Sequence, residues 1–251
     1  MFSVFKLPVC LMTTTRSYHV SSFLNKIQPQ NLKNKSKSSQ EWLSRQLNDP
    51  YIKKARYHNY RARSAFKLLE INERFQLLKP GMMVVECGAA PGAWTQVLVE
   101  KLNQTSQGKH LKGRVIALDI KSMEPVMGAE TISGVDCTEH STQDKVLKML
   151  GNQKVDIVLS DMAPNATGIK EMDHEQITSL AYSALTFSFN LLQVESGVFL
   201  CKIWEGKNTE RLASDLKKFF KLVKHVKPAS SRTDSSELYF LAKGFRGITV
   251  V

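Results

Sequence analysis

The sequence has few cysteines, and none of them stand at the close spacing that metal-binding or redox motifs use. No C-x-x-C pair occurs, and no histidine cluster lies at metal-ligand spacing from any of the four, which are Cys10, Cys87, Cys137 and Cys201. This pattern argues against both a disulfide framework and a zinc site, so we expect no bound metal. We interpret the last three cysteines, which stand at predicted strand ends, as small buried apolar groups.

Carboxylates are missing from the amino-terminal end of the chain. No aspartate or glutamate precedes Glu41, while lysines and arginines alternate with apolar and hydroxyl residues. This composition is typical of a mitochondrial presequence, which we predict over residues 1–26, and it predicts a mitochondrial (matrix) location. The alternative is a basic arm without a targeting role. A polar linker is expected over 27–39 and a folded domain over 40–251.

A long apolar run is missing as well. The most apolar part of the first residues, Val4 to Met12, is interrupted by Lys6 and Pro8. A membrane-spanning helix needs about 20 consecutive apolar residues, so no span is expected anywhere in the chain.

Positive charge is concentrated at one end. The net charge is +12; residues 1–80 hold fifteen Lys and Arg against four Asp and Glu, whereas residues 81–251 hold twenty against nineteen. Within the basic part, tyrosine and histidine interleave with five cations, which are Lys53, Lys54, Arg56, Arg61 and Arg63. Cations contact phosphates and aromatic rings stack on unpaired bases, so this segment is predicted to bind RNA. A solvated basic surface remains the alternative.

The remainder alternates between strand-like and helix-like segments, which indicates an α/β fold. Near-continuous apolar runs, such as Val155 to Leu159, favour a mostly parallel sheet of seven strands with helices on both faces. The loop 228–236 between the last two strands is too short for a crossover helix, so these strands are expected to pair antiparallel. Helices are expected over 41–47, 63–75, 142–150, 174–193 and 208–220 and from Ala93, and the segment 103–113 has no assigned structure.

A glycine-bearing turn between the first strand and the next helix predicts a nucleoside site. The turn has neither the G-x-G-x-x-G pattern of dinucleotide sites nor a Walker loop, so no phosphate-binding chemistry is indicated. Aspartates at the ends of the following strands can accept hydrogen bonds from ribose hydroxyls and an adenine amino group, which favours S-adenosylmethionine. The predicted cofactor-binding residues are Gly88, Pro91, Gly92, Ala93, Trp94, Asp119, Asp136 and Asp161.

Five segments in this order resemble the signatures of the FtsJ/RrmJ family of ribosomal RNA 2′-O-ribose methyltransferases: 63–68, 88–94, 160–165, 201–202 and 235–237. The resemblance covers about residues 50–245 and implies a Rossmann-like, S-adenosylmethionine-dependent methyltransferase. Together with the presequence it points to the mitochondrial members, which modify a uridine of the large-subunit rRNA. It implies ribosomal RNA within an assembling large-subunit particle as the partner, and we expect a monomer. In the family the acidic residue that opens the glycine turn is usually Asp, and here it is Glu86.

The resemblance also implies a catalytic tetrad of Lys67, Asp161, Lys202 and Glu237. A ribose hydroxyl is a poor acid, so methyl transfer needs a base close to the oxygen. Burial and a neighbouring cation favour the neutral form of a lysine, and Lys202 interrupts an apolar strand, so we predict Lys202 as the base with Lys67 and Glu237 orienting it. The tetrad does not identify the RNA, so tRNA or an mRNA cap stay open as substrates, as does a non-catalytic role in rRNA assembly.

Overall fold

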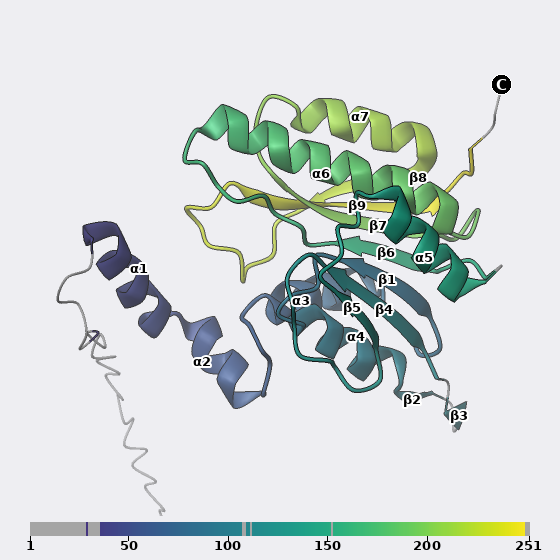
Figure 1. Ribbon diagram of the computed structural model, residues 1–251, viewed down its shortest axis with the longest axis horizontal. Coiled ribbons are helices and arrows are strands. Elements are labelled where there is room, and N and C mark those ends of the chain that lie inside the picture. Colours follow the sequence, from purple (N-terminus) through teal and green to yellow (C-terminus); the bar gives the residue numbers. More distant parts are fainter. Residues whose placement is uncertain (1–28, 30–35, 107–108, 111, 152, 249–251) are drawn as a thin grey trace, which may run out of the picture. The chain divides into compact units, whose positions relative to one another are not determined.

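A computed structural model describes residues 29, 36–106, 109–110, 112–151 and 153–248 (Figure 1). The predicted presequence, residues 1–26, and Cys10 lie outside the described residues. Helix α1 (Lys37–Asn48) forms a unit by itself and begins within the last residues of the predicted linker. The chain from Asp49 to Val251 forms the other compact unit and holds all the elements described below.

The centre of this unit is a seven-stranded sheet. Its strands lie in the order β5 (Glu130–Ser133), β4 (Arg114–Asp119), β1 (Met83–Cys87), β6 (Ile157–Ser160), β7 (Val198–Trp204), β9 (Glu237–Phe245) and β8 (Phe220–Val226). The first five strands are parallel, and β9 pairs antiparallel with both β7 and β8. The predicted mostly parallel sheet with one antiparallel strand is therefore confirmed.

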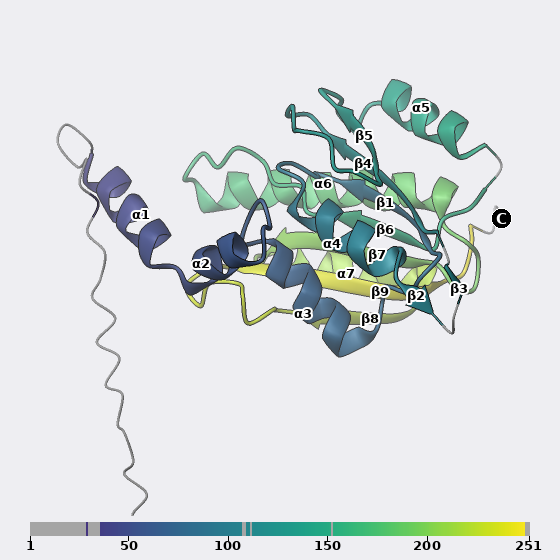
Figure 2. The same cartoon turned by 90° about the horizontal axis from the view of Figure 1, so that it is seen from below.

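Helices cover both faces of the sheet (Figures 1 and 2). One face carries α3 (Ala65–Phe75) and α4 (Ala93–Leu102), and the other carries α5 (His140–Leu150), α6 (Lys170–Leu191) and α7 (Thr209–Phe219). Because the central strands are covered on both sides, β1 and β6 are buried along nearly their whole length. This two-sided burial is the reason that their sequences read as continuous apolar runs.

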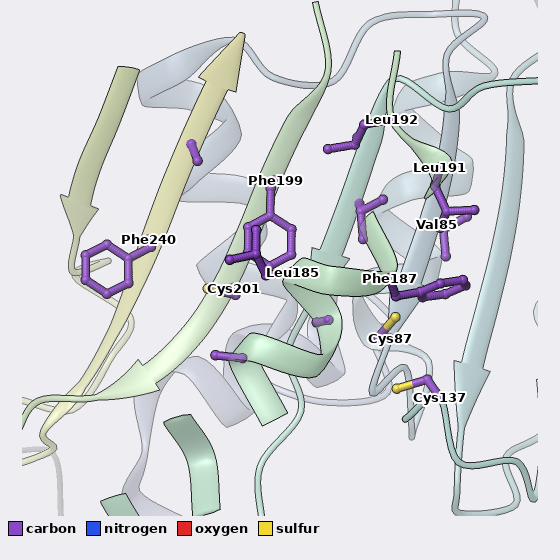
Figure 3. Packing of buried hydrophobic residues seen from close by; sticks show 14 of the residues in the cluster. Val85, Cys87, Cys137, Leu185, Phe187, Leu191, Leu192, Phe199, Cys201 and Phe240 are labelled. Carbon is purple, nitrogen blue, oxygen red and sulfur yellow. The ribbon is translucent and has the colours of Figure 1, made fainter. Parts of the chain in front are cut away.

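Two hydrophobic clusters result, one on each face. The cluster under α6 contains aromatic and aliphatic side chains from the helix and from β1, β7 and β9, together with the three buried cysteines (Figure 3). The cluster under α3 and α4 contains Trp94, Tyr239 and Leu200. Fully buried apolar side chains of this size each contribute about 1.5–3 kcal/mol to the free energy of unfolding.

Three elements were not predicted. Helix α2 (Pro50–Tyr57) lies in the basic segment; Asp49 caps it by accepting a hydrogen bond from the Tyr51 amide, and Pro50 occupies its first turn. In the unassigned segment 103–113, β2 (Thr105–Ser106) and β3 (Lys109–His110) form a small antiparallel pair.

Boundaries differ slightly from those predicted. Helix α6 begins four residues earlier than expected, at Lys170, and ends two residues earlier, at Leu191. Within the described residues, no helix combines the length and the apolar character needed to cross a bilayer.

Candidate active site

A cavity of about 610 Å³ opens beyond the carboxyl ends of β1, β4, β6 and β7. Open α/β sheets bind their ligands at this edge, and the volume lies within the usual range for small-molecule sites. Four of the predicted cofactor-binding residues line it: Gly88, Asp119, Asp136 and Asp161. Lys202 of the predicted tetrad lines the same cavity.

Glycine is required at two positions of the turn after β1. Gly88 has a φ of +78°, and a Cβ there would lie 2.7 Å from the Met162 amide nitrogen. Gly92 has a φ of +100°, and a Cβ there would lie 2.7 Å from the Arg61 guanidinium. The turn can therefore approach the segment after β6 on one side and Arg61 on the other only without side chains.

The two aspartates that follow β4 and β5 are positioned by backbone amides. Asp119 accepts hydrogen bonds from the Ala90 and Lys121 amides, both at 2.7 Å, so it also fixes the turn after β1. Oδ1 of Asp136 accepts from the amide and the hydroxyl of Thr138, both at 2.8 Å. Each carboxylate oxygen has two lone pairs, so both groups keep acceptor capacity that faces the cavity.

The other predicted cofactor-binding residues lie behind the cavity rather than in its wall. The carbonyl of Pro91 accepts from Arg61, and Gly92 and Ala93 begin α4 in the buried layer. Trp94 is 2% exposed; its Nε1 donates to the Ser64 carbonyl at 2.8 Å, and its ring lies 5.7 Å from that of Tyr239. These residues support the turn and the start of α3.

Lys67 and Glu237, from α3 and β9, form one half of the predicted tetrad. Lys67 Nζ lies 2.7 Å from Glu237 Oε2 and 2.6 Å from Oε1, and both side chains are 13% exposed. The Ser231 hydroxyl donates to Oε1 of the same carboxylate at 2.9 Å. The lysine is thereby held in one orientation although it projects from the surface of a helix.

Lys202 and Asp161 form the other half. Lys202 Nζ donates to the Asp161 carbonyl at 2.5 Å and lies 3.1 Å from its carboxylate oxygen Oδ1. The Tyr239 hydroxyl donates to the same Oδ1 at 2.8 Å. Tyr239 lies opposite Lys202 in the pairing of β7 with β9, and Glu237 lies two residues before it, so one antiparallel pair brings both halves together.

Tyr239 remains protonated in this environment. Burial raises the pKa of Tyr239 well above its ordinary value, and the nearby Asp161 and Glu237 carboxylates raise it further. The hydroxyl therefore acts as a fixed hydrogen-bond donor to Asp161. Sequence reasoning did not identify Tyr239, although the two-residue period of a strand places it on the same face as Glu237.

Glu86 lies in β1 immediately behind the turn. Its side chain is buried, Oε2 accepts from the Thr95 hydroxyl at 2.7 Å, and Oε1 has no hydrogen-bond partner among the described residues. Burial raises the pKa of Glu86 to about 8, against the hydrogen bond from Thr95, and the Asp161 and Asp119 carboxylates raise it further. Glu86 thus contacts the first turn of α4 and is mostly protonated at neutral pH.

The predicted RNA-binding residues fall into two groups. Lys53, Lys54 and Arg56 are exposed on α2. Arg61 is engaged with backbone carbonyls: its guanidinium donates to Pro91 at 3.0 Å, to Glu124 at 2.5 Å and to Pro125 at 2.8 Å.

Arg63 is engaged as well. It forms an ion pair with the buried Asp49 and donates to the Ser230 carbonyl. Arg232 lies 3.7 Å from the same Asp49 carboxylate. The guanidinium of Arg63 thus joins the start of α2 to the loop before β9.

Several wall residues were not predicted from the sequence. One side of the cavity comes from the segment after β6 and from the exposed face of α6; its members are Met162, Ala163, Pro164, Asn165, Gln176, Ser179 and Leu180. Ile120, which is 65% exposed, and Lys121 extend the wall beyond Asp119. The segment 160–165 was recognised as a family signature, but no cofactor-binding role was predicted for its residues after Asp161, and no pattern in the sequence marks the positions on α6 or after Asp119.

The three described cysteines are buried, as predicted. Burial raises the pKa of the Cys201 thiol to about 12, so it stays neutral. In the part of the chain that the structure describes, no group of three or more His, Cys, Asp or Glu side chains could hold a metal ion.

The cavity fits a nucleoside bearing a short charged chain. It combines an apolar wall at Ile120 and Val135 with carboxylates at three strand ends and a glycine turn open to backbone approach. Lys202 also lines the cavity and is paired with the Asp161 carboxylate, so a group capable of proton transfer lies in the wall of the site.

The comparisons with known proteins agree with this geometry. Residues 60–245 match the family described as FtsJ-like methyltransferase. The chain is 47% identical over 225 residues to "rRNA methyltransferase 2, mitochondrial" of Drosophila melanogaster, covering 89% of this chain and 90% of that protein. It is 43% identical over 222 residues to "Ribosomal RNA large subunit methyltransferase E" of Xanthobacter autotrophicus, covering 88% of this chain and 85% of that protein.

A crystal structure described as a ribosomal RNA methyltransferase from Plasmodium falciparum has the same fold. It superimposes with a TM-score of 0.66 at 30% sequence identity, covering 75% of this chain and all of that one. The family match spans every element from α3 to β9, including the cavity and the tetrad. The chain therefore belongs to the FtsJ-like methyltransferase family.

Proposed function

We propose that this protein transfers a methyl group from S-adenosylmethionine to the 2′-hydroxyl of a uridine in mitochondrial large-subunit rRNA. The observation that carries the proposal is the shared wall: Asp161 and Lys202 line the cofactor cavity and form one half of the tetrad. A cofactor methyl group in the cavity and a ribose hydroxyl at the lysine would therefore lie next to one another. Holding the two reacting groups next to one another in this way lowers the barrier to methyl transfer.

S-Adenosylmethionine would be held by the glycine turn and by three aspartates. Asp119 is suited to the ribose hydroxyls and Asp136 to the adenine amino group, because each has free acceptor capacity toward the cavity. When bound, the cofactor supplies an electrophilic methyl group on a positively charged sulfur. Asp161 places a carboxylate near that charge.

Lys202 is the proposed base. Two of its N–H directions are occupied by the carbonyl and carboxylate oxygens of Asp161. In the neutral amine the lone pair occupies the remaining tetrahedral direction, where it can accept the proton of a ribose hydroxyl. Lys67, held by Glu237, would position the ribose and balance the charge that develops on its oxygen.

Oxygen is favoured over nitrogen as the methyl acceptor. Amino-group methyltransferases use an Asn/Asp-Pro-Pro-aromatic motif to accept hydrogen bonds from an exocyclic nitrogen. This chain has Asp161-Met162-Ala163-Pro164 at the corresponding place. A lysine base is also unnecessary for an amine, which is nucleophilic without losing a proton first.

The substrate and location rest on the relatives. The Drosophila protein is described as mitochondrial and as an rRNA methyltransferase, and 47% identity over nearly the whole length supports the same assignment here. The acid-free segment 1–26 fits a transit peptide to the matrix. The exposed lysines and arginine of α2 would bind rRNA phosphates, and we propose a monomer that acts during large-subunit assembly.

Mapping of 2′-O-methylation across mitochondrial RNA tests the proposal. Cells that lack the protein and cells that carry Lys202→Ala should both lose one methyl group from the large-subunit rRNA, while a control variant, Lys218→Ala, should retain it. Lys218 is a suitable control because it is 65% exposed on α7, away from the cavity. If Lys202→Ala retains the methyl group, Lys202 is not the base.

Other outcomes redirect the assignment. If tRNA and not rRNA loses a methyl group, the proposed substrate is wrong. If the Lys202→Ala cells lose the methyl group but assemble ribosomes normally, while cells without the protein do not, the role in assembly is independent of catalysis.

A further inference from the structure

A group of cations surrounds one aromatic ring at the end of α3 that is remote from the tetrad. The guanidinium carbon of Arg74 lies 5.1 Å from the centre of the Phe75 ring, Lys224 Nζ lies 5.6 Å from it and Lys243 Nζ 6.0 Å. Lys243 also donates to the Phe75 carbonyl at 3.0 Å. We call these residues, with the neighbouring Lys79, the Phe75 patch.

The charge of the Phe75 patch is not neutralised by the protein. Arg74, Lys79 and Lys224 are exposed, and none of the four cations forms an ion pair with a carboxylate of the described residues. Burial lowers the pKa of Lys243, and the neighbouring Lys224 and Lys79 lower it further. Like charges that repel one another in this way bind a polyanion favourably, because its phosphates relieve the repulsion.

The fold connects the Phe75 patch to the active site. Along helix α3, Lys67 and Phe75 lie about 12 Å apart at 1.5 Å per residue. Along strand β9, Glu237 and Lys243 lie about 20 Å apart at 3.4 Å per residue. Each element carries a tetrad residue near its start and a patch residue near its end, and the two lie beside each other and beside β8 (Figure 2).

The same combination of cation and aromatic ring occurs at the start of α3. Lys54 Nζ lies 4.8 Å from the centre of the Phe66 ring, in the segment predicted to bind RNA. Basic residues therefore stand at both ends of one helix whose middle carries no exposed lysine or arginine. A nucleic acid that contacts both ends would follow α3 along its length.

We propose that the Phe75 patch is a second RNA-binding surface, which holds the substrate strand about 12 to 20 Å away from the methylated ribose. This inference rests on the proposed function and deepens it. The half-buried ring offers a stacking surface beside the phosphate contacts, which favours RNA over an anionic membrane.

Fluorescence anisotropy with the full-length protein tests the patch. The variant Arg74→Ala/Lys224→Ala removes two exposed cations, and Lys145→Ala/Lys148→Ala removes two exposed cations from α5 as a matched control. For a single-stranded RNA of roughly 15 nucleotides, the patch variant should show a slope of log affinity against log salt that is smaller by about 1.4, or 0.7 for each phosphate that is no longer bound. The control should keep the wild-type slope, and binding of a trinucleotide should be equal in all three proteins.

Three results would overturn the inference, two of them in the salt dependence. One is a wild-type slope in the patch variant; the other is an equal reduction of the slope in the control, which would mean that only net charge matters. Loss of binding to anionic phospholipid vesicles with unchanged RNA binding would also reject RNA as the ligand.

The mapping of 2′-O-methylation in cells, described above, separates this inference from the proposed function. If RNA binding depends on the patch but cells without the protein lose no methyl group from mitochondrial rRNA, the proposed function fails and the patch stands. If those cells lose the methyl group but RNA binding does not depend on the patch, the proposed function stands and the patch is rejected.

Discussion

Tyr239 connects the two halves of the tetrad. It lies opposite Lys202 in the strand pairing, donates to Asp161 at 2.8 Å and is fully buried. Trp94 packs against its ring, so the hydroxyl has one available position. Lys202 and Tyr239 both contact Oδ1 of Asp161. By fixing this carboxylate, the tyrosine helps to position the lysine.

We predict that Tyr239→Phe lowers the rate of methyl transfer at saturating cofactor and RNA about tenfold. A hydrogen bond to a charged group contributes about 1.5–3 kcal/mol, and about 1.4 kcal/mol corresponds to a factor of ten. The packing with Trp94 is retained, so the fold should be unchanged. Tyr182→Phe, which removes a similar hydrogen bond to Asp215, is the control. Equal single-turnover rates for the two variants would contradict a role for Tyr239.

Glu86 gives a prediction about pH. In the folded chain its pKa is about 8, against 4.5 without the fold, so between these values the folded state holds a proton that the unfolded state has lost. The contribution of Glu86 to the free energy of unfolding is therefore largest below the unfolded pKa. It falls by about 1.4 kcal/mol per pH unit as the pH rises through this window.

Glu86→Gln removes this titration but keeps an acceptor for Thr95. The stability of the variant relative to the wild type should increase steadily in urea unfolding at about pH 5.5, 6.5 and 7.5. A constant difference across these values would show that Glu86 is ionised in the folded protein.

Among the elements, the loops after β1 and β4 form the mouth of the cavity, and Arg61 joins them. One guanidinium binds the carbonyls of Pro91, Glu124 and Pro125, which belong to these two loops. Arg61 was predicted to contact RNA, but its three hydrogen bonds hold together two loops beside the cofactor cavity. RNA binding by Arg61 stays a prediction.

We expect Arg61→Ala to weaken S-adenosylmethionine binding about tenfold in the absence of RNA, since the loss of charge-assisted hydrogen bonds, each worth about 1.5–3 kcal/mol, frees both loops. Arg61→Lys should not restore it, because an ammonium group cannot span three carbonyls. Isothermal titration calorimetry measures the effect, with the exposed Arg56→Ala as control. Unchanged cofactor affinity with weakened RNA affinity would favour the RNA role instead.

The elements that could be predicted are those whose pattern is local. The seven strands were found because strands covered on both faces form continuous apolar runs, and the cavity aspartates because they stand at strand ends. Helix α2 was missed although Asp49 and Pro50 mark its start, because the basic residues were interpreted only as a binding surface. The contacts of Arg63 could not be predicted, since Ser230 lies 167 residues further along the chain.

At the scale of the whole molecule, the buried apolar residues of the described part of the chain all lie within the unit from Asp49 to Val251. A chain that begins at Asp49 should therefore unfold within about 2 °C of the full-length protein in thermal scans. A chain that begins at His58 is the control, because it lacks α2 and leaves Arg63 without its buried partner Asp49. It should unfold at a clearly lower temperature; equal melting of the two truncated chains would show that α2 contributes nothing.

The antiparallel strand β9 has a consequence for the order in which the sheet and the site can be completed. It lies between β7 and β8, although β8 precedes it in the chain, and it carries Glu237, the partner of Lys67 that lies 170 residues away. Strand β8 can therefore pair with the sheet only once β9 is in place. The same strand supplies Tyr239, the donor to Asp161, so the catalytic tetrad is completed by the strand that comes last in the chain.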